Sequence, residues 1–566
     1  MAKFFKPGKK SKEKVDRRVE EVLDTYKDLR NLSTERLQRY DENLRWFKGD
    51  KDICYPGGRE EHQSAVIANI IESNIRTITA VLTDSKPIMR VKAFPLVSLE
   101  EQQEELIRKF SEANDNVLHH IWRVNDMHSH IRQNVLNGCL TGLMCERIFW
   151  DSSKYGGLGE VGAEVIHPRY IFFDPKVPKI DLEDGSCDWF IYAIYKPLSW
   201  FHYYWPGIDV SPISRAELRE EFDEQTNVEM GLYIEAYKAE YEIEEEKSDF
   251  SGKEIKKRRA RYPKGRRIII GTDKVLEDSV IDIFPFAVEP IADEAESLWG
   301  ADDVRRQIEL QREFNLKLSQ LSQNIALASN RQAVATEECG LDPEIYAENA
   351  DRPGMLFLLD MGKDLNDFHK GFEILQTPNV QPELFQFVYT IMELMEKVTG
   401  VTKLIQGLSA KRERQTGFEI GKMLETATIR LRERAGHVES FIRQIGLIIM
   451  QYVSKYYREP RPVWSIDQTT GEMVISRYEF PKQRNRITGE EEPIDWEYDI
   501  EVQPDSTLPI DLNSLANIAM RLKERQVITN KELLKRLQLS HWEAMPEQTA
   551  APEAQKPPMP PPTGMA

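Results

Sequence analysis

Four cationic residues lie close together in the last third of the chain: Lys403, Lys411, Arg412 and Arg414. Three of them fall in the segment LIQGLSAKRERQTG (404–417), which is bounded by glycines and joins two stretches of helical periodicity. Lysine and arginine side chains bind phosphate oxygens and position a protein on nucleic acid without selecting a base sequence. The segment therefore predicts a loop that presents positive charge to a polyanion, although the residues alone are explained more simply by a solvated loop.

Common catalytic motifs for nucleotide hydrolysis, zinc peptidases and serine hydrolases are absent, because the sequence has no GxxxxGK[ST], HExxH or GxSxG. Histidines gather only between residues 119 and 130, without a cysteine at zinc spacing, so we expect surface or core histidines there. The acids Asp302 and Asp303 are attributed to capping of a helix, whose positive end favours acids. We predict that the protein is not an enzyme and has no cofactor and no metal.

The length of the chain and its net charge limit the number of domains and the classes of protein to which it can belong. The 566 residues correspond to three or four domains at roughly 150 residues each. The chain has 76 basic and 94 acidic side chains and a net charge of −18. Such an overall field repels nucleic acid, so a protein that coats DNA is disfavoured while a local basic patch is still allowed.

The cellular compartment is indicated by cysteines and apolar runs. Five scattered cysteines without a CxxC pair indicate a reducing compartment. The basic N-terminus has no apolar stretch behind it, and the most apolar run (445–453) is too short to span a bilayer. We expect a soluble protein made inside a cell, with no secretory signal and no membrane partner.

Hydrophobic periodicity organises the chain around residues 300–457. Apolar residues three or four apart predict one helix over 300–329, a second after Pro382 and a very long one from Gly417 to about residue 457. At about 1.5 Å per residue the long helix would measure roughly 60 Å, which is long for an ordinary domain. A compact insert with strand-like pieces separates the first two helices.

The remaining elements follow from the same patterns. They are two amphipathic helices in 14–46, helices over 63–82 and 99–142 with a strand after Pro87, a β-rich region over 147–290, a small antiparallel sheet over 463–503 and two short helices within 512–537. An acidic segment (240–249) and a basic one (253–267) are explained better by facing strands with paired charges than by a nucleic-acid patch. The first 18 residues and the proline-rich end, which contains PPMPPP, are expected to be disordered.

The order of these parts resembles the portal proteins of tailed bacteriophages. The resemblance is carried by VIHPRYIFFDP (165–175), IFPFAVEP (283–290), Trp299-Gly300, a helix with Gln311, Asn315 and Ser319, KVTGV (397–401), the basic loop, and the start of the long helix. Each motif is degenerate, and the specificity lies in the ordered series from about residue 15 to 540. The loop-to-helix junction, often Ser-Gly in relatives, is Thr416-Gly417 here.

The resemblance implies an α+β fold, that of a portal-like ring subunit with an α/β wing, a two-helix stem, a β-containing clip, a long wing helix and a short helical crown. Together with the composition of the two ends, it divides the chain as follows: disordered basic arm 1–18, wing 19–299, first stem helix 300–330, clip 331–376, second stem helix 377–400, tunnel loop 401–416, long wing helix 417–458, C-terminal wing sheet 459–508, crown helices 509–542 and disordered tail 543–566.

The resemblance further implies a homo-oligomeric ring, usually a dodecamer, at one vertex of the capsid. Such a ring is the channel for packaging and ejection of double-stranded DNA. Its clip docks the terminase and later the neck or tail adaptor, and major capsid and scaffolding proteins surround it. The protein would be assembled in the host cytoplasm and found in the virion, with Lys403, Lys411, Arg412 and Arg414 on the tunnel loop.

Two other classes fit parts of the sequence. A coiled-coil scaffold built on 417–457, without a channel, would form dimers or trimers. It would need no β-rich insert between helices, and Gly421, Gly436 and Gly446 weaken its seam. A nuclease or ATPase of the packaging machinery would need motifs that the sequence lacks.

Overall fold

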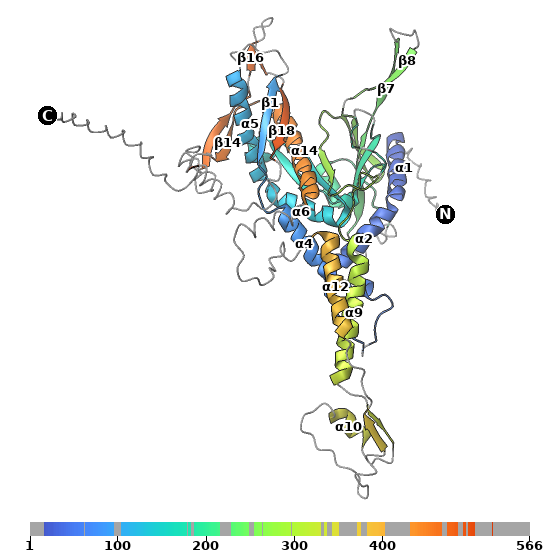
Figure 1. Cartoon of the computed structure of the whole chain (residues 1–566). Coiled ribbons are helices and arrows are strands. Elements are labelled where there is room, and N and C mark those ends of the chain that lie inside the picture. Colours follow the sequence, from blue (N-terminus) through green and yellow to red (C-terminus); the bar gives the residue numbers. More distant parts are fainter. Residues whose placement is uncertain are drawn as a thin grey trace, which may run out of the picture.

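The computed structural model describes residues 16–503 and Lys523, with internal gaps. The gaps are residues 61–62, 96–103, 178, 183–185, 215–227, 248–253, 263, 296, 330–332, 337–341, 350–370, 375–381, 402–430, 467–472, 481, 485–490 and 494–495. The described part is an α+β body from which one helix pair projects, with a small module of strands and a helix at the far end of that pair (Figure 1).

A five-stranded antiparallel sheet in the order β10-β9-β6-β5-β4 forms one half of the body. Its strands bury side chains on both faces, because successive residues point to opposite sides. Ile268 and Ile270 of β9 pack with Val22 of helix α1, whereas Ile269 belongs to the core on the other face, with Trp299.

The elements of this half are α1 (Arg17–Leu32), α2 (Thr34–Lys48), α3 (Lys51–Cys54), η3 (Pro168–Tyr170), β4 (Ile171–Phe172), β5 (Trp189–Pro197), α7 (Leu198–Tyr204), β6 (Met230–Lys238), β9 (Arg266–Gly271) and β10 (Lys274–Val280). Strands β7 (Tyr241–Lys247) and β8 (Glu254–Ala260) form a separate hairpin, with Glu244 opposite Lys257. The facing strands predicted from the acidic and basic segments are confirmed.

A three-stranded antiparallel sheet, β11-β2-β3, forms the other half and packs against helix α14. The apolar stripe predicted for the long helix is fully buried here: Val438, Ile442, Ile445, Ile449 and Val453. The predicted start of this helix at Gly417 lies outside the described residues. The elements of this half are α4 (Ile70–Leu82), α5 (Glu104–Val124), α6 (Met127–Thr141), β2 (Leu143–Asp151), η2 (Lys154–Gly157), β3 (Glu160–Val165), β11 (Phe286–Pro290) and α14 (Arg432–Tyr456).

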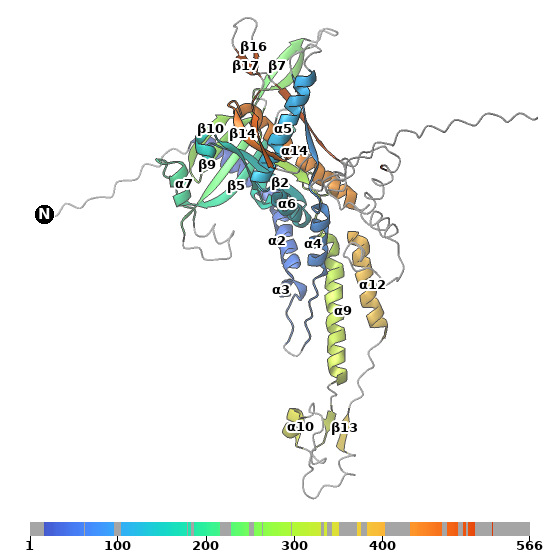
Figure 2. The same cartoon turned by 90° about the vertical axis from the view of Figure 1, so that its left-hand side faces the viewer.

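Helices α9 (Arg305–Ser329) and α12 (Pro382–Thr399) lie side by side and run away from the body (Figures 1 and 2). Val388, Ile391 and Met395 of α12 share one core with Ile308 and Phe314 of α9. The apolar spacing that predicts these two helices also includes Ile325 and Val398, but both side chains are exposed. On α12 the buried row runs 388, 391, 395 and 399, and residue 398 lies about a quarter turn away from it.

The insert between these helices contains a short hairpin at the far end of the pair. Strand β12 (Ala333–Ala335) pairs antiparallel with β13 (Phe372–Ile374), and helix α10 (Pro343–Asn349) lies beside them (Figure 2). The strand predicted from RQAVAT is confirmed, whereas the one predicted from MLFLLD lies outside the described residues.

The chain enters α9 through a tight crossing of two glycines. Gly142 and Gly300 have φ values of 91° and 72°, and a Cβ atom on either would lie 2.5 Å from the carbonyl oxygen of the other. Only glycine fits such a crossing. Next to it, Trp299 is stacked on Phe173 with ring centroids 4.1 Å apart, and the Arg36 guanidinium lies 3.3 Å from the Trp299 ring centroid. The Trp299-Gly300 pair thus fixes where the helix pair leaves the body.

Residues 64–69 do not belong to a helix, which corrects the helix predicted over 63–82. They run along α9 on a row of buried polar side chains, called the polar ladder here: Gln307, Gln311, Asn315 and Ser319. Gln311 Oε1 accepts hydrogen bonds from the N–H groups of Ile70 and Ile71 at 3.0 and 3.3 Å, and Gln311 Nε2 donates to the Ala68 carbonyl at 2.7 Å. The ladder therefore supplies acceptors to N–H groups at the start of α4 that have no partner within the helix.

The helical region predicted over 99–142 is confirmed from Glu104 to Thr141, where it consists of two helices because the chain breaks between α5 and α6. Asp126, with a φ of 48°, lies in the left-handed region at this break. A non-glycine residue in that region ends a helix.

The sheet predicted over 463–503 is wrong as a single sheet. Strand β14 (Arg461–Ile466) pairs with β15 (Met473–Tyr478), and β16 (Lys482–Arg484) pairs with β17 (Glu491–Pro493). Strand β18 (Trp496–Val502) pairs instead with β1 (Met89–Pro95) from the N-terminal region. The register places Val91 opposite Ile500, and both side chains are buried. Burial of one face therefore determines the partner and the register.

Candidate nucleic-acid interface

The predicted DNA-binding residues lie in the gap 402–430 of the described structure: Lys403, Lys411, Arg412 and Arg414. The structure describes both ends of this basic segment. Val401 and Leu431 are fully buried and belong to one hydrophobic core, together with residues of α9, α12 and α14. The points at which the basic segment leaves the body and returns to it are therefore fixed.

At the first end, helix α12 stops in a local hydrogen-bond arrangement. Thr399 Oγ1 donates to the Met395 carbonyl at 2.9 Å and accepts from the Val401 N–H at 3.2 Å. Gly400, with a φ of 77°, donates its N–H to the Glu396 carbonyl at 3.0 Å. A left-handed glycine ends a helix without strain. This glycine turns the chain so that Val401 enters the core.

At the second end, Arg434 attaches the start of α14 to the start of α9. Its guanidinium donates two hydrogen bonds to the Asp303 carboxylate, with Nε at 3.0 Å from Oδ2. The two side chains are only 8% and 5% exposed, and the Asp303 N–H donates to the Cys139 carbonyl at 2.9 Å. Burial alone would lower the pKa of Arg434, but the charge of Asp303 and its hydrogen bonds raise that pKa, so the guanidinium keeps its charge.

The prediction that both Asp302 and Asp303 cap a helix is therefore only half right. Asp302 Oδ1 accepts from the N–H groups of Val304 and Arg305 at 3.1 and 2.7 Å, as a capping residue does. Asp303 pairs with Arg434, which lies 131 residues later in the chain. Sequence spacing could not show this partner, because the contact exists only after α14 packs against the entry to α9.

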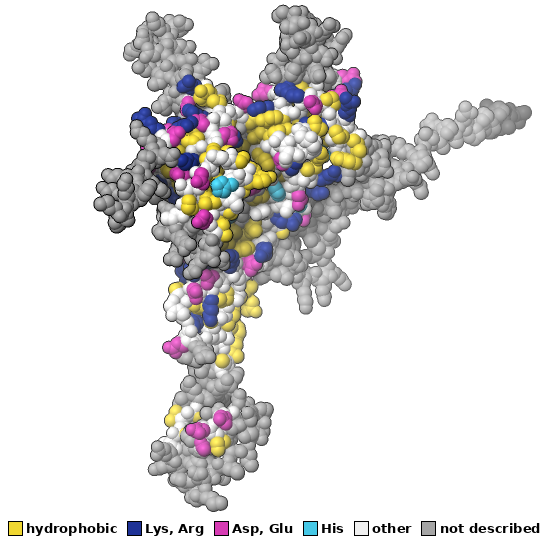
Figure 3. All heavy atoms as spheres, turned by 180° about the vertical axis from the view of Figure 1, so that it is seen from behind, with side chains coloured by type: hydrophobic (Ala, Val, Ile, Leu, Met, Phe, Trp, Pro, Cys, Tyr) yellow, Lys and Arg dark blue, Asp and Glu magenta, His cyan; other side chains and the backbone are white. Residues whose placement is uncertain are grey.

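Helix α12 also carries a row of exposed apolar side chains, called the α12 stripe here. Phe387, Leu394 and Val398 are 47%, 41% and 44% exposed. They lie seven and four residues apart, which places them on one helix face beside the face that packs on α9. Hydrophobic side chains are also visible along one side of the helix pair in Figure 3. A row of exposed apolar side chains on one helix face is typical of surfaces that contact another protein.

A family model described as Phage P22-like portal protein matches residues 16–556. The chain belongs to this family. The resemblance seen in the sequence is thereby confirmed, and portal proteins are structural proteins of the phage particle. Family membership implies a homo-oligomeric ring and a place at the capsid vertex of the virion. No curated protein gives a significant match to the chain.

Two further features of this portal chain are its histidines between 119 and 130 and its apolar helices. The histidines between 119 and 130 do not form one cluster: His119 is exposed and His120 is buried. His130 Nδ1 lies 2.7 Å from Glu146 Oε1, and this hydrogen bond raises the pKa of His130. His120 is buried 3.8 Å from Glu160. None of the helices within the described ranges combines the length and apolar character needed to cross a membrane.

Residues 157–162 spell GLGEVG and so match the spacing of a dinucleotide-binding loop, GxGxxG. That motif works where a strand turns into a helix whose N-terminus meets the pyrophosphate. Here the residues run from a turn into strand β3, and a Cβ atom on Gly159 would meet the Trp150 ring at 2.3 Å. Gly159 and Gly162 allow close packing against Trp150 and Phe149, and the segment lacks the strand-to-helix turn of a nucleotide site.

A cavity of about 190 Å³ lies between strands β2, β9 and β10 and the end of α14. Its cationic residues are all paired with acids. Arg147 donates to Glu235 at 2.8 Å, Lys455 donates to Asp282 at 2.7 Å, and Arg267 pairs with Glu277. The cavity therefore has no surplus positive charge with which to bind a phosphate.

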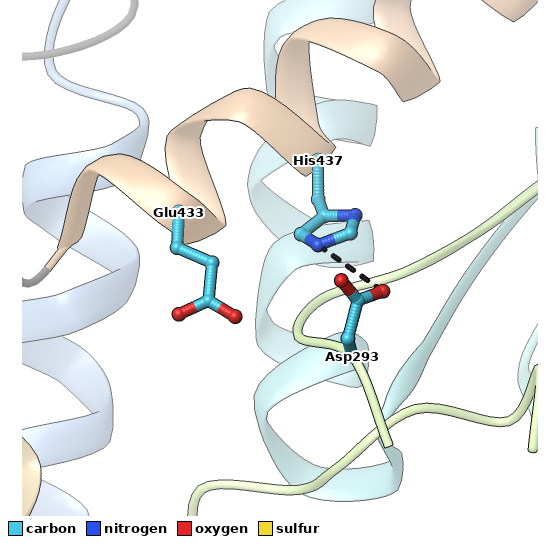
Figure 4. Close-up of side chains that lie close together, drawn as sticks. All are labelled: Asp293, Glu433 and His437. Atoms are coloured by element: carbon cyan, nitrogen blue, oxygen red, sulfur yellow. Dashed lines mark ion pairs between the residues drawn. The ribbon is translucent and has the colours of Figure 1, made fainter. Parts of the chain in front are cut away.

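Sequence reasoning missed one group of three potential metal ligands in the described part of the chain: Asp293, Glu433 and His437 (Figure 4). The spacing of Glu433 and His437, four residues apart on a helix, was a usable signal. The closeness of Asp293 was not, because it comes from the loop after β11.

Proposed function

We propose that this chain is the subunit of a portal ring at one capsid vertex, and that the ring is the channel through which double-stranded DNA is packaged and ejected. The match to the portal family over residues 16–556 carries this proposal. The structure supports it with a helix pair that projects from an α+β body, and with a basic segment that starts and ends at the base of that pair.

In this assignment the α+β body is the wing, and helices α9 and α12 are the stem. The insert 331–376 is the clip, on which the terminase and later the neck or tail adaptor dock. Residues 509–542, of which the structure describes only Lys523, are the crown. No ATP motif is expected in such a subunit, since the terminase would supply the motor.

The α12 stripe supports ring formation. In one isolated chain Phe387, Leu394 and Val398 expose apolar surface along the outside of the helix pair. A neighbouring subunit would cover this surface, and the usual closed ring of the family has twelve subunits. The free energy gained by burying apolar area, roughly 25 cal/mol per Å², would favour the ring.

The basic segment would act as a tunnel loop. Lys403, Lys411, Arg412 and Arg414 would form weak, salt-sensitive contacts with DNA phosphates, while the net charge of −18 per subunit limits sticking elsewhere. Because Thr399, Gly400 and the Arg434–Asp303 pair fix both ends, a force on the loop would be transmitted to the base of the stem.

The coiled-coil alternative conflicts with the packing of α14. A coiled-coil seam needs an apolar stripe that is free to meet a second helix. The stripe of α14 is covered by strands β2, β11 and β18 of its own chain.

The proposal is tested by negative-stain imaging of the purified full-length chain together with mass measurement of the particles. Rings of about twelve subunits around an open channel are expected. Dimers or short rods would contradict the proposal. If the chain purifies as monomers, the same imaging is repeated with the chain produced together with its capsid and scaffolding proteins, and particles without a ring at a vertex would contradict it.

The role of the loop is tested separately by changing Lys411, Arg412 and Arg414 together to alanine. We expect intact rings but altered packaging or retention of DNA. A matched control that exchanges each cation for the other (Lys411→Arg, Arg412→Lys, Arg414→Lys) keeps the charge and should package normally. Unchanged length and retention of packaged DNA in the alanine variant would remove the loop from the mechanism.

A further inference from the structure

We propose that Asp293, Glu433 and His437 bind a divalent transition-metal ion of the zinc class. The site would join the first turns of α14 to the loop that follows β11 (Figure 4). One ligand atom from each side chain lies within 4.8 Å of the other two. One histidine nitrogen and two carboxylate oxygens suit zinc and related ions, whereas Mg²⁺ and Ca²⁺ prefer oxygen ligands alone.

The imidazole of His437 is held in the orientation that metal binding needs. Its Nδ1 lies 3.3 Å from Oε1 of Glu289, and Oε2 of Glu289 accepts from Gln444 Nε2 at 2.6 Å. Gln444 is fixed in turn, because its Oε1 accepts from the Val288 N–H at 3.2 Å. Histidines that bind metals usually donate their second ring N–H to a carboxylate in this way. With the proton on Nδ1, the lone pair of Nε2 faces the side on which Asp293 lies.

The distance between the first two ligand atoms fits a shared ion. Nε2 of His437 and Oδ1 of Asp293 are 3.6 Å apart, which is longer than an ordinary N–H···O hydrogen bond. Zinc bonds of about 2.0–2.2 Å at a tetrahedral angle place a nitrogen and an oxygen ligand about 3.3–3.5 Å apart. Glu433 lies one helical turn before His437 on the same face, and its exposed side chain is free to rotate toward the other two.

The charge around the imidazole also favours a cation. Three carboxylates lie around the imidazole of His437, those of Glu289, Asp293 and Glu433. Like charges this close repel one another, and a divalent ion would remove that repulsion. The simpler alternative is a protonated imidazole that forms ion pairs with these carboxylates and binds no metal, and the experiment below separates the two.

A metal here would provide a second attachment for the start of α14. The neighbouring residue, Arg434, already holds this turn to Asp303. The ion would fasten the same turn to the loop after β11, close to the end of the basic segment. This proposal does not depend on the proposed function, because metal binding can be measured on the purified chain alone.

The test is a titration of the metal-free full-length chain with Zn²⁺ at pH 8, followed by calorimetry and by elemental analysis after buffer exchange. We expect one retained Zn²⁺ per subunit, a rise in the unfolding temperature, and much weaker binding of Mg²⁺ and Ca²⁺. Co²⁺ in place of Zn²⁺ should give the visible absorption of a cobalt ion with a nitrogen ligand.

Variants of single residues test whether the ion binds to these side chains. His437→Ala and Asp293→Asn should abolish retention of Zn²⁺, and Glu289→Gln should weaken binding about 10- to 100-fold by releasing the imidazole. Glu294→Gln removes one charge beside the site and should bind as the parent does. Asp293 is exposed, so its variant keeps the test valid if His437→Ala does not fold. Sub-stoichiometric binding by the parent, or equal binding by Asp293→Asn and Glu294→Gln, would show an ordinary acidic surface and overturn the proposal.

Discussion

Helix α9 meets its two neighbours by different means. Toward residues 64–74 it presents the polar ladder, whose amide and hydroxyl groups form directed hydrogen bonds with backbone and side chains. It also contributes apolar side chains such as Ile308 and Phe314 to the hydrophobic core that includes Val388 and Ile391 of α12. Apolar burial contributes free energy without direction, whereas buried hydrogen bonds contribute little net free energy but are costly to leave unmade. The apolar side therefore stabilises the pair, and the polar side fixes the register of an extended segment.

The largest loss of stability is expected on the apolar side. Phe314→Ala should lower the free energy of unfolding by about 3–5 kcal/mol, because it leaves a cavity in the hydrophobic core to which α9 and α12 both contribute. Denaturant unfolding followed by far-UV circular dichroism measures this loss, and Phe314→Leu should lose much less. A loss below about 1 kcal/mol for the alanine variant would show that the apolar side is not the main source of stability.

On the polar side, Gln311→Leu should lower the free energy of unfolding by about 2–3 kcal/mol. Leucine has a similar size but no polar group, so the N–H groups of Ile70 and Ile71 and the Ala68 carbonyl lose the buried Gln311 amide as a partner. The loss should be local. Limited proteolysis should cut within residues 56–69 more rapidly, while α9 and α12 stay paired. Gln320→Leu, an exposed control on the same helix, should change neither measurement. Equal proteolysis of the two variants would show that the ladder does not hold the segment.

A smaller effect is expected at the end of the ladder. Ser319→Ala removes the hydroxyl that accepts from the Val66 N–H at 3.0 Å, but the Tyr55 hydroxyl keeps the Val66 carbonyl at 2.7 Å as a partner. The loss should be about 1 kcal/mol, typical of one hydrogen bond. A double-mutant cycle with Tyr55→Phe checks whether the two hydroxyls act together. Additive losses would mean that they are independent.

The smallest effect on the stability of one chain is expected at the α12 stripe. The double variant Leu394→Gln, Val398→Gln should change the free energy of unfolding by less than about 0.5 kcal/mol, because both side chains are exposed. It should nevertheless prevent ring formation, measured by mass and imaging. Tyr389→Gln, on the opposite flank of α12, is the matched control. Rings that assemble normally in the double variant would show that the stripe lies outside the subunit interface.

Local periodicity was sufficient for much of the fold. The helices that became α9, α12 and the described part of α14 were predicted from apolar residues three or four apart, and the β7–β8 hairpin from its charge pattern. The cationic residues of the candidate interface were also visible in the sequence. Each of these predictions depends on neighbours along the chain, whose spacing the sequence prints directly.

Contacts between distant residues were decided only by the tertiary structure. Polar residues four apart on a helix, such as Gln307 and Gln311, normally indicate a solvated face, and their burial depends on the segment that packs against them. Likewise the pairing of β18 with β1 and of Arg434 with Asp303 joins residues far apart in the chain. The burial of apolar faces brings distant segments of the chain together. Two strands or two charges that are far apart in the sequence can pair only after this burial has placed them side by side.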